Sequence, residues 1–328
     1  DQEPTIQKIL DLDIKDEDRA AILNEFDMYK TSEPYSEAYH LYRESLINKI
    51  KRFDEKKVDK IIVDLIPIKI NELNTSDHNK NILLNLYEEC KMKNDDDRFS
   101  REKEKLFKYY LLLPYDTIKT FAPQKRQEIV PFLLQIKEKL DSELYGLEDV
   151  KEQLLLYINN KITNPSSNKN NLALCGPPGV GKTALIKAVA DALGLPLELM
   201  ALGGTKDSAP FKGSYQMWEG SCPSLIIEAL KRMKVSNGIF LMDELDKIDR
   251  EEVENALIHL TDQTLNAKSE DLFLSEITHN FSNLWFMFSM NDEHRVNKIL
   301  RDRLTIINIP KYTKEELFNK INIFFLLF

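Results

Sequence analysis

The stretch of sequence that decides the fold is Gly176-Pro177-Pro178-Gly179-Val180-Gly181-Lys182-Thr183. A short apolar run, Leu172–Cys175, leads into it, and a helical pattern of apolar residues, Thr183–Leu193, leads out of it. This is the spacing G-x4-G-K-T, the phosphate-binding loop that joins a strand to a helix in nucleotide-binding α/β domains. The alternative is a chance glycine-rich turn, but spacing, lysine, threonine and flanking strand all favour the phosphate-binding loop.

Each residue type in this loop has a chemical reason to be there. Glycines let successive backbone N–H groups turn inward on phosphates, and the N-terminus of the following helix adds partial positive charge. Lys182 would supply a cation to the β and γ phosphates, while the Thr183 hydroxyl can bind Mg²⁺. We therefore predict that Gly176 to Thr183 bind ATP and that Thr183 also binds Mg²⁺.

A second apolar run, Ile239–Met242, ends in two acids, Asp243 and Glu244. A carboxylate after a neighbouring strand is where a second metal-holding group belongs in such a site. We predict that Asp243 holds the Mg²⁺ shell through water and that Glu244 polarises the attacking water. The alternative is a pair of solvated acids at a strand-to-helix turn.

From Asn171 onward, short apolar runs alternate with helical stretches, which is typical of a parallel sheet with crossover helices. All ten glycines lie between Gly146 and Gly238, the part of the chain where tight turns and close approach to a ligand are expected. We predict an α/β domain over 141–310. Its expected strands are Leu172–Cys175, Leu197–Ala201, Ile239–Met242, Leu284–Met290 and Thr305–Ile309, and its expected helices are Thr183–Leu193, Pro223–Met233 and Glu251–Leu260.

Helical patterns flank this domain on both sides. Residues 1–140 contain no glycine, and their apolar residues recur at helical spacing, as in Leu41-Leu46-Ile47-Ile50. Turn composition at Asn74–Asp77 and at Leu113–Asp116 divides this α-helical N-terminal region. At the other end, Thr313-Lys314-Glu315-Glu316 has capping-box composition, so 311–328 is predicted to begin a helical lid that is truncated here.

Composition narrows the classes of function. The chain has 328 residues, with 45 Lys and Arg against 54 Asp and Glu, which gives a net charge of −9. This charge argues against broad electrostatic binding to the phosphates of nucleic acid. No apolar run approaches the ~20 residues that span a bilayer. Three cysteines, too far apart for a paired metal site or disulfide framework, favour a reducing, cytoplasmic setting.

The two motifs, Gly176–Thr183 and Asp243-Glu244, resemble the Walker A and Walker B elements of AAA+ ATPases. That resemblance implies a three-layer sandwich around a five-stranded parallel sheet. Within the AAA+ proteins, Tyr145-Gly146-Leu147 and the acidic residues after it look like the segment that precedes the nucleotide site in Lon proteases. The resemblance implies that Tyr145, Gly146 and Leu147 lie against the adenine; the alternative is a core tyrosine at the start of a helix.

The same resemblance extends to a loop after the second strand, Phe211–Gly220, which looks like the pore-loop region of Lon proteases. Trp218 stands where that family carries a pore aromatic residue, although the basic residues and tyrosine of the family's loop are replaced here. A large flat side chain there could grip an extended polypeptide, so Trp218 is the candidate pulling contact. The alternative is an ordinary packing tryptophan.

Two further polar residues match positions of the family. Asn291, after an apolar strand, corresponds to the first sensor, which orients water near the γ phosphate; a turn asparagine is the alternative. Arg303 corresponds to the arginine finger, with Arg301 as second candidate. A finger acts on the nucleotide of a neighbouring subunit, so the resemblance implies a homo-oligomeric ring, a hexamer. A surface salt bridge is the alternative for Arg303.

The reading that joins these features is an ATP-hydrolysing motor that unfolds and translocates unfolded or misfolded proteins, as the ATPase part of a Lon-like ATP-dependent protease. Neither the family's second sensor arginine nor its serine–lysine peptidase dyad can be located in this sequence. Two other readings stay open: a scaffold that nucleotide merely switches, and an AAA+ protein that remodels nucleic acid. Glu244, Asn291 and Arg303 disfavour the first, and the acidic charge disfavours the second.

Overall fold

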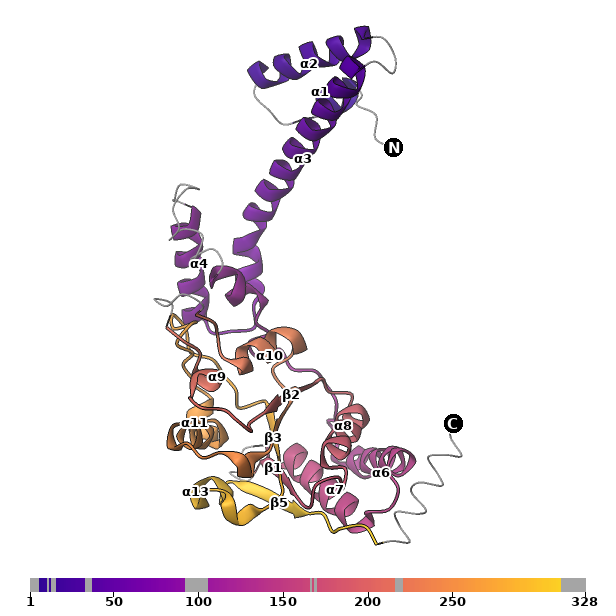
Figure 1. Cartoon of the computed structure of the whole chain (residues 1–328), viewed down its shortest axis with the longest axis vertical. Coiled ribbons are helices and arrows are strands. Elements are labelled where there is room, and N and C mark those ends of the chain that lie inside the picture. Colours follow the sequence, from indigo (N-terminus) through magenta and orange to yellow (C-terminus); the bar gives the residue numbers. More distant parts are fainter. Residues whose placement is uncertain are drawn as a thin grey trace. The chain divides into compact units, whose positions relative to one another are not determined.

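The computed structural model describes residues 6–10, 12, 16–32, 37–91, 106–165, 167, 170–215 and 221–313. The chain divides into two compact units, Asp1–Glu72 and Leu73–Phe328 (Figure 1). Two stretches on which predictions rest, the segment around Trp218 and most of the expected lid, lie outside the described residues. No helix in the described part is long and apolar enough to cross a membrane.

The first unit is helical, as its apolar spacing predicts. It contains α1 (Ile6–Leu10), α2 (Asp16–Thr31) and the long α3 (Glu37–Glu72). One apolar cluster holds these helices together, and its buried members are Ile9, Leu12, Ile22, Phe26, Tyr29, Leu46 and Ile50. This unit therefore has a small core of its own.

The second unit is built on a five-stranded parallel sheet, which confirms the predicted α/β fold. Its strands are β1 (Asn171–Cys175), β2 (Leu197–Ala201), β3 (Ile239–Asp243), β4 (Trp285–Met290) and β5 (Leu304–Asn308), in the order β2-β3-β4-β1-β5. Each predicted strand agrees with the observed one to within a residue at either end. Because β1 lies between β4 and β5, the loop that follows it opens at the carboxyl edge of the sheet beside the end of β4.

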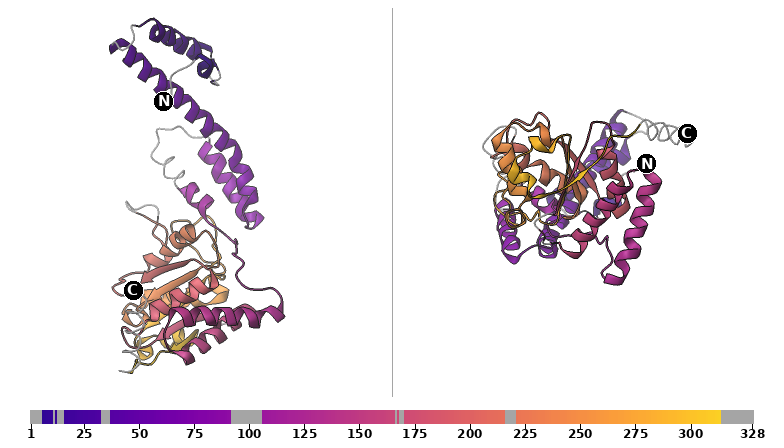
Figure 2. Two further views of the ribbon diagram at one scale, coloured as in Figure 1. Left: turned by 90° about the vertical axis from the view of Figure 1, so that its right-hand side faces the viewer. Right: turned by 90° about the horizontal axis from the view of Figure 1, so that it is seen from below.

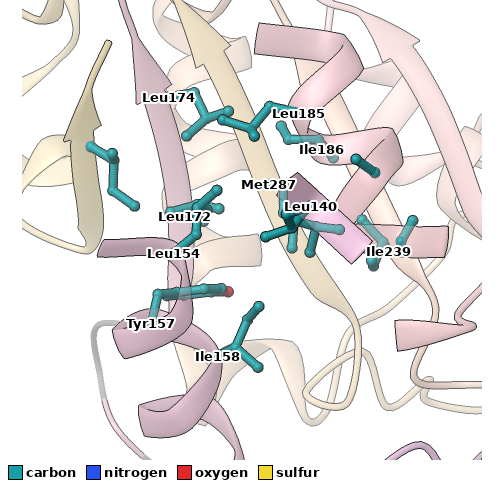
Figure 3. Packing of buried hydrophobic residues seen from close by; sticks show 14 of the residues in the cluster. Leu140, Leu154, Tyr157, Ile158, Leu172, Leu174, Leu185, Ile186, Ile239 and Met287 are labelled. Atoms are coloured by element: carbon teal, nitrogen blue, oxygen red, sulfur yellow. The ribbon is translucent and has the colours of Figure 1, made fainter. Parts of the chain in front are cut away.

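Alternate residues of the strands face a layer formed by three helices, α6 (Arg126–Glu143), α7 (Glu148–Thr163) and α8 (Lys182–Leu193). Figure 3 shows this packing, in which Leu140, Leu154 and Leu185 come from one helix each. The strand residues that share the cluster include Leu172, Leu174, Ile239, Leu241, Trp285, Met287 and Ile307, all at most 2% exposed. This two-residue alternation is what a strand between two layers requires.

The opposite side of the sheet carries the remaining crossover helices. α10 (Leu225–Met233) joins β2 to β3, and α11 (Glu251–Thr261) follows β3. α13 (Lys298–Arg301) leads into β5 and lies with α11 on the side away from α6, α7 and α8 (Figure 1). The three layers can be followed from two further directions in Figure 2.

The second unit also contains helical residues that precede the α/β segment. α4 (Asp77–Lys91) and helical residues 106–112 lead to an extended stretch that runs along the domain. There Thr117 accepts hydrogen bonds from the N–H and hydroxyl of Ser236, and Lys119 bonds the side chain of Asn237 through both backbone groups. These contacts attach the stretch to the sheet domain, while a domain boundary between 140 and 141 remains a prediction.

Candidate functional site

The loop Gly176–Thr183 lies between the end of β1 and the start of α8. Gly179 and Gly181 have φ angles of 80° and 98°, a left-handed region that favours glycine, so the turn depends on both. Gly176 is needed for a different reason: a Cβ there would lie 2.6 Å from the carbonyl oxygen of Ile309. Val180 is buried in the apolar cluster under the loop, which it supports from the protein side.

The Lys182 amine lies at the centre of the site. Its Nζ donates to the carbonyl oxygens of Gly176 at 2.7 Å and Pro177 at 3.1 Å, and to Asn291 Oδ1 at 2.9 Å. Partial burial lowers the pKa of Lys182 below its ordinary value, and the carboxylates of Asp243 and Asp246 act in the opposite direction. The lysine and the asparagine that the sequence singles out are therefore in direct contact.

Asp243 is the last residue of β3, and its carboxylate is oriented by two donors. The Ser289 hydroxyl donates to Asp243 Oδ1, and the N–H of Glu244 donates to the same oxygen at 3.0 Å. Ser289 is buried on the adjacent strand β4, so its hydroxyl is held in place by the sheet. The carboxylate thus has a fixed direction before any ligand arrives.

Glu244 turns sharply away from the strand. Its φ angle is 64°, left-handed for a residue with a side chain, and a 3-10 turn, Leu245–Lys247, follows it. Backbone conformations of this kind are concentrated at functional sites. Gly203, in the loop after β2, lies directly against the Glu244 carboxylate, because a Cβ added at Gly203 would overlap that group.

Ends of parallel strands bring these groups together in one pocket of about 330 Å³. Its lining residues are Pro178, Gly179, Gly181, Lys182, Thr183, Ala184, Asp243, Glu244, Ser289, Met290 and Asn291. Eight of these are residues that the sequence singles out. A crevice at the carboxyl ends of the strands of an open α/β sheet is where such domains bind ligands.

The donor set suits a nucleotide with Mg²⁺. Among the described residues, no group of three or more His, Cys, Asp or Glu side chains could hold a metal ion by itself. Mg²⁺ is usually held by one or two carboxylate or hydroxyl oxygens together with water and substrate phosphates, and not by an all-protein cage. Thr183 and Asp243 in one pocket with Lys182 fit that arrangement.

The segment Tyr145-Gly146-Leu147 precedes α7 and is not among the residues that line this pocket in the described structure. Gly146 and Leu147 both have left-handed φ angles, 65° and 62°. The turn is held by Lys151, a buried residue whose Nζ bonds Asp141 Oδ1 at 2.7 Å and the Leu144 carbonyl at 2.8 Å. Contact of this turn with adenine stays a prediction.

Arg303 contacts its own chain. Its Nη2 lies 3.0 Å from Asp262 Oδ2, and its Nη1 donates to the Ile258 carbonyl at 2.5 Å. Hydrogen bonds from Thr264 chiefly lower the pKa of Asp262, with a further contribution from Arg303. In the described part of the chain, the Arg301 side chain has no hydrogen bond or ion pair. A role for either arginine on a neighbouring subunit stays a prediction.

Sequence reasoning missed Ser289 and Gly203. Ser289 could have been found, because residues two apart on a strand point the same way and Ser289 precedes Asn291 by two. Gly203 could not, since its contact with Glu244 joins the loops after two different strands. Trp218 lies outside the described residues.

Comparison with known proteins agrees with this geometry. A family model described as "ATPase family associated with various cellular activities (AAA)" matches residues 172–311. The chain is 34% identical over 187 residues to a Lon protease of Fusobacterium nucleatum, covering 56% of this chain and 24% of that protein.

Two other relatives give similar values. The identity is 37% over 194 residues with Lon protease 4 of Sorangium cellulosum, covering 58% of this chain and 24% of that protein. With Lon protease homolog 2, peroxisomal, of Arabidopsis thaliana, it is 36% over 183 residues, covering 55% and 20%. The chain therefore spans about a quarter or less of the relatives it matches.

Proposed function

We propose that this chain is a protein-unfolding motor, because the AAA ATPase family model matches residues 172–311 and the relatives described above are Lon proteases. In this proposal it binds ATP with Mg²⁺ and uses hydrolysis to unfold and translocate unfolded or misfolded proteins. The observation that carries it is the convergence of Lys182, Asp243, Glu244 and Asn291 in one pocket. The protein would work as the ATPase part of a Lon-like protease in the cytoplasm.

Phosphate binding is assigned to the loop Gly176–Thr183. Residues of this loop and of the first turn of α8 line the pocket, and Lys182 would exchange its contacts with the Gly176 and Pro177 carbonyls for phosphate oxygens. Bound Mg²⁺, held by Thr183 and near Asp243, would neutralise charge between the β and γ phosphates. Asp243 is kept in the required direction by Ser289.

Activation of water is assigned to Glu244 and Asn291. A carboxylate can accept a proton from, or orient, the attacking water, and an amide can hold that water in line with the γ phosphate. The left-handed turn at Glu244 and the close approach of its carboxylate to Gly203 support this assignment. Asn291 bonds Lys182, so it can respond to phosphate binding.

The mechanical part of the proposal concerns contacts with the substrate, the adenine and a neighbouring subunit. Trp218 would contact the substrate polypeptide, Tyr145 to Leu147 would hold the adenine, and Arg303 would act on the nucleotide of a neighbour in a hexameric ring. The names of the relatives, which are Lon proteases, support this assignment. A role in remodelling nucleic acid is disfavoured by the net charge of −9.

The test uses the full-length protein and a fluorescent protein that carries an unstructured tail. We expect its fluorescence to be lost with ATP and Mg²⁺, and to persist with the Glu244→Gln variant, which can bind but not hydrolyse ATP. A wild-type protein that hydrolyses ATP yet unfolds no tailed substrate would contradict the motor proposal. A nucleotide-switched scaffold would behave in that way.

A further inference from the structure

Both ends of the segment that carries Trp218 meet one buried carboxylate, that of Asp271. On one side, the short helix α9 (Ala209–Lys212) ends at Gly213; on the other, Ser224 caps α10. Two of the described residues between them, Ser214 and Cys222, bond each other: Ser214 N–H donates to Cys222 O at 3.1 Å and Cys222 N–H to Ser214 Oγ at 2.9 Å. Ser214 and Cys222, on either side of the Trp218 segment, are therefore joined by hydrogen bonds.

Asp271 has 2% of its surface exposed and accepts three backbone hydrogen bonds. Its Oδ2 accepts from the Ser224 N–H at 2.9 Å, and its Oδ1 accepts from the N–H groups of Phe273 at 2.9 Å and Leu274 at 3.1 Å. Hydrogen bonds to an ionised acceptor are about twice as strong as neutral ones. The carboxylate thus ties the start of α10 to the loop that contains it.

Gly213 meets the same carboxylate by close approach. Its φ and ψ angles are 71° and −173°, a combination that only glycine adopts freely. A Cβ added there would lie 2.7 Å from Asp271 Oδ1. The neighbouring Lys212 carbonyl accepts from the Leu272 N–H at 2.7 Å. The backbone of residues 212–213 therefore packs closely against the loop at Asp271.

The loop that carries Asp271 is itself well held. Ser269 and His279 exchange two backbone hydrogen bonds, and the His279 ring stacks on Phe281 with an interplanar angle of 9°. The N–H of Glu276 donates to the hydroxyl of Tyr110, from helical residues 106–112. Asp271 is thus a fixed point, and it is not among the residues that line the nucleotide pocket.

We propose that Asp271 is a positioning residue for substrate movement, which fixes the base of the Trp218 segment so that motion of the ATPase domain reaches the bound polypeptide. This rests on the proposed motor function. A segment that pulls must transmit force through its base, and this base has one charged anchor that contacts both of its ends. Loss of that anchor should uncouple ATP hydrolysis from unfolding and leave nucleotide chemistry in place.

The first experiment uses amide hydrogen exchange in this chain to test whether Asp271 holds the backbone N–H groups that bond to it. Asp271→Asn keeps the size of the side chain but replaces one acceptor oxygen with a donor. We expect the amides that face the new NH2 group, either Ser224 or the pair Phe273 and Leu274, to exchange about tenfold faster, as loss of a hydrogen bond to a charged group implies. Glu270→Gln, next to it and exposed, is the control. Unchanged exchange at these amides would show that Asp271 does not hold them, and would contradict the proposal.

The second experiment removes a single bond in case Asp271→Asn does not fold. Ser224 has a φ angle of −59°, which proline adopts, so Ser224→Pro deletes the N–H that Asp271 accepts. It also deletes the hydroxyl that caps Ile227, and Ser224→Ala, which keeps the N–H, is the matched control for that loss.

The readout in the full-length protein is the number of ATP molecules hydrolysed per substrate molecule unfolded. We expect Ser224→Pro and Asp271→Asn to raise this ratio several-fold, while Ser224→Ala and Glu270→Gln leave it near the wild-type value. General misfolding would lower both rates together, so the ratio is compared only among variants whose ATPase rate stays near the wild-type value. Equal ratios in all variants would overturn the proposal, whereas a wild type that unfolds nothing would contradict the motor function and leave the exchange result standing.

Discussion

At the scale of single residues, the site depends on side chains that orient other side chains. Lys182 is held by Asn291, and Asp243 is held by Ser289, so two strands, a loop and a helix are joined through two hydrogen bonds. Such supporting contacts fix the direction of a metal-binding carboxylate before the ligand binds. The proposed role of Asp243 therefore predicts that the Ser289 hydroxyl affects Mg²⁺ binding by orienting that carboxylate.

The change Ser289→Ala removes the hydroxyl that donates to Asp243. We expect Mg²⁺ affinity in the presence of ATP, or turnover, to fall by about 10-fold to 100-fold, as for other residues that orient metal ligands. The measurement is ATPase rate against Mg²⁺ concentration. Ser275→Ala, at an exposed serine, is the control. Equal Mg²⁺ dependence in both variants would show that the Asp243 carboxylate needs no support from Ser289.

At the scale of elements, the sequence predicts which segments are strands and helices, because each apolar run and each glycine turn is local. The five strands and the Gly176–Thr183 loop follow from such patterns. The order β2-β3-β4-β1-β5 does not, since pairing joins strands far apart in the chain. The buried Lys151 bonds that hold the turn at Tyr145 join residues only 10 and 7 positions apart, but they depend on how α6 and α7 pack, which the apolar pattern does not predict.

Helix α7 carries a lysine in an unfavourable place. Lys161 is 9% exposed and its Nζ lies 5.6 Å from the centre of the Trp285 ring. Among the described residues it makes one hydrogen bond, to the Asn170 carbonyl, which is 3.4 Å long. Burial lowers the pKa of Lys161 from 10.5 to about 8. Between these two values the unfolded chain binds more protons than the folded chain, so this residue makes stability rise with pH. Below pH 8 the charged amine destabilises the fold by a constant amount.

The change Lys161→Met keeps the length of the side chain and removes the charge. We expect the variant to be more stable than wild type at pH 7 by about 1–3 kcal/mol, and the difference to shrink as pH rises toward 10. Urea unfolding at pH 7 and pH 9.5 measures both values. Lys187→Met, at an exposed lysine of α8, is the control. A constant difference at the two pH values would mean that the buried amine is not the cause.

At the scale of the whole molecule, a ring would place Arg303 beside the nucleotide of a neighbour. In the single chain its guanidinium pairs with Asp262, the salt bridge that the sequence leaves open as an alternative. An intramolecular pair at 26% and 25% exposure is a modest interaction and does not exclude a second role. An arginine that also acts on a neighbouring nucleotide should affect turnover more than nucleotide affinity.

The prediction for Arg303→Ala is therefore a large loss of turnover with little change in ATP affinity. Arginine fingers contribute on the order of 10³–10⁵ in rate because their charge matters mainly in the transition state. Mixing this variant with Glu244→Gln in the full-length protein tests the position of the arginine. Certain mixed interfaces join an intact site to an intact finger, so activity should return although neither pure variant hydrolyses ATP.

Arg301→Ala is the control for Arg303→Ala, and two outcomes would contradict the prediction. Arg301→Ala, two residues earlier, should retain turnover if Arg303 is the finger. Unchanged turnover in Arg303→Ala, or no recovery in mixtures that demonstrably assemble together, would move the assignment to Arg301.

Equilibrium ATP binding and phosphate release, measured together on Glu244→Gln, test the central claim most directly. We propose that Lys182 contacts phosphate and that Glu244 activates water, and both residues line the pocket, so this variant should bind ATP as wild type does and release phosphate at a small fraction of its rate. Lys182→Ala should lose binding itself, while Lys187→Ala on the same helix should lose neither. Full phosphate release by Glu244→Gln would contradict the division of roles on which the whole account rests.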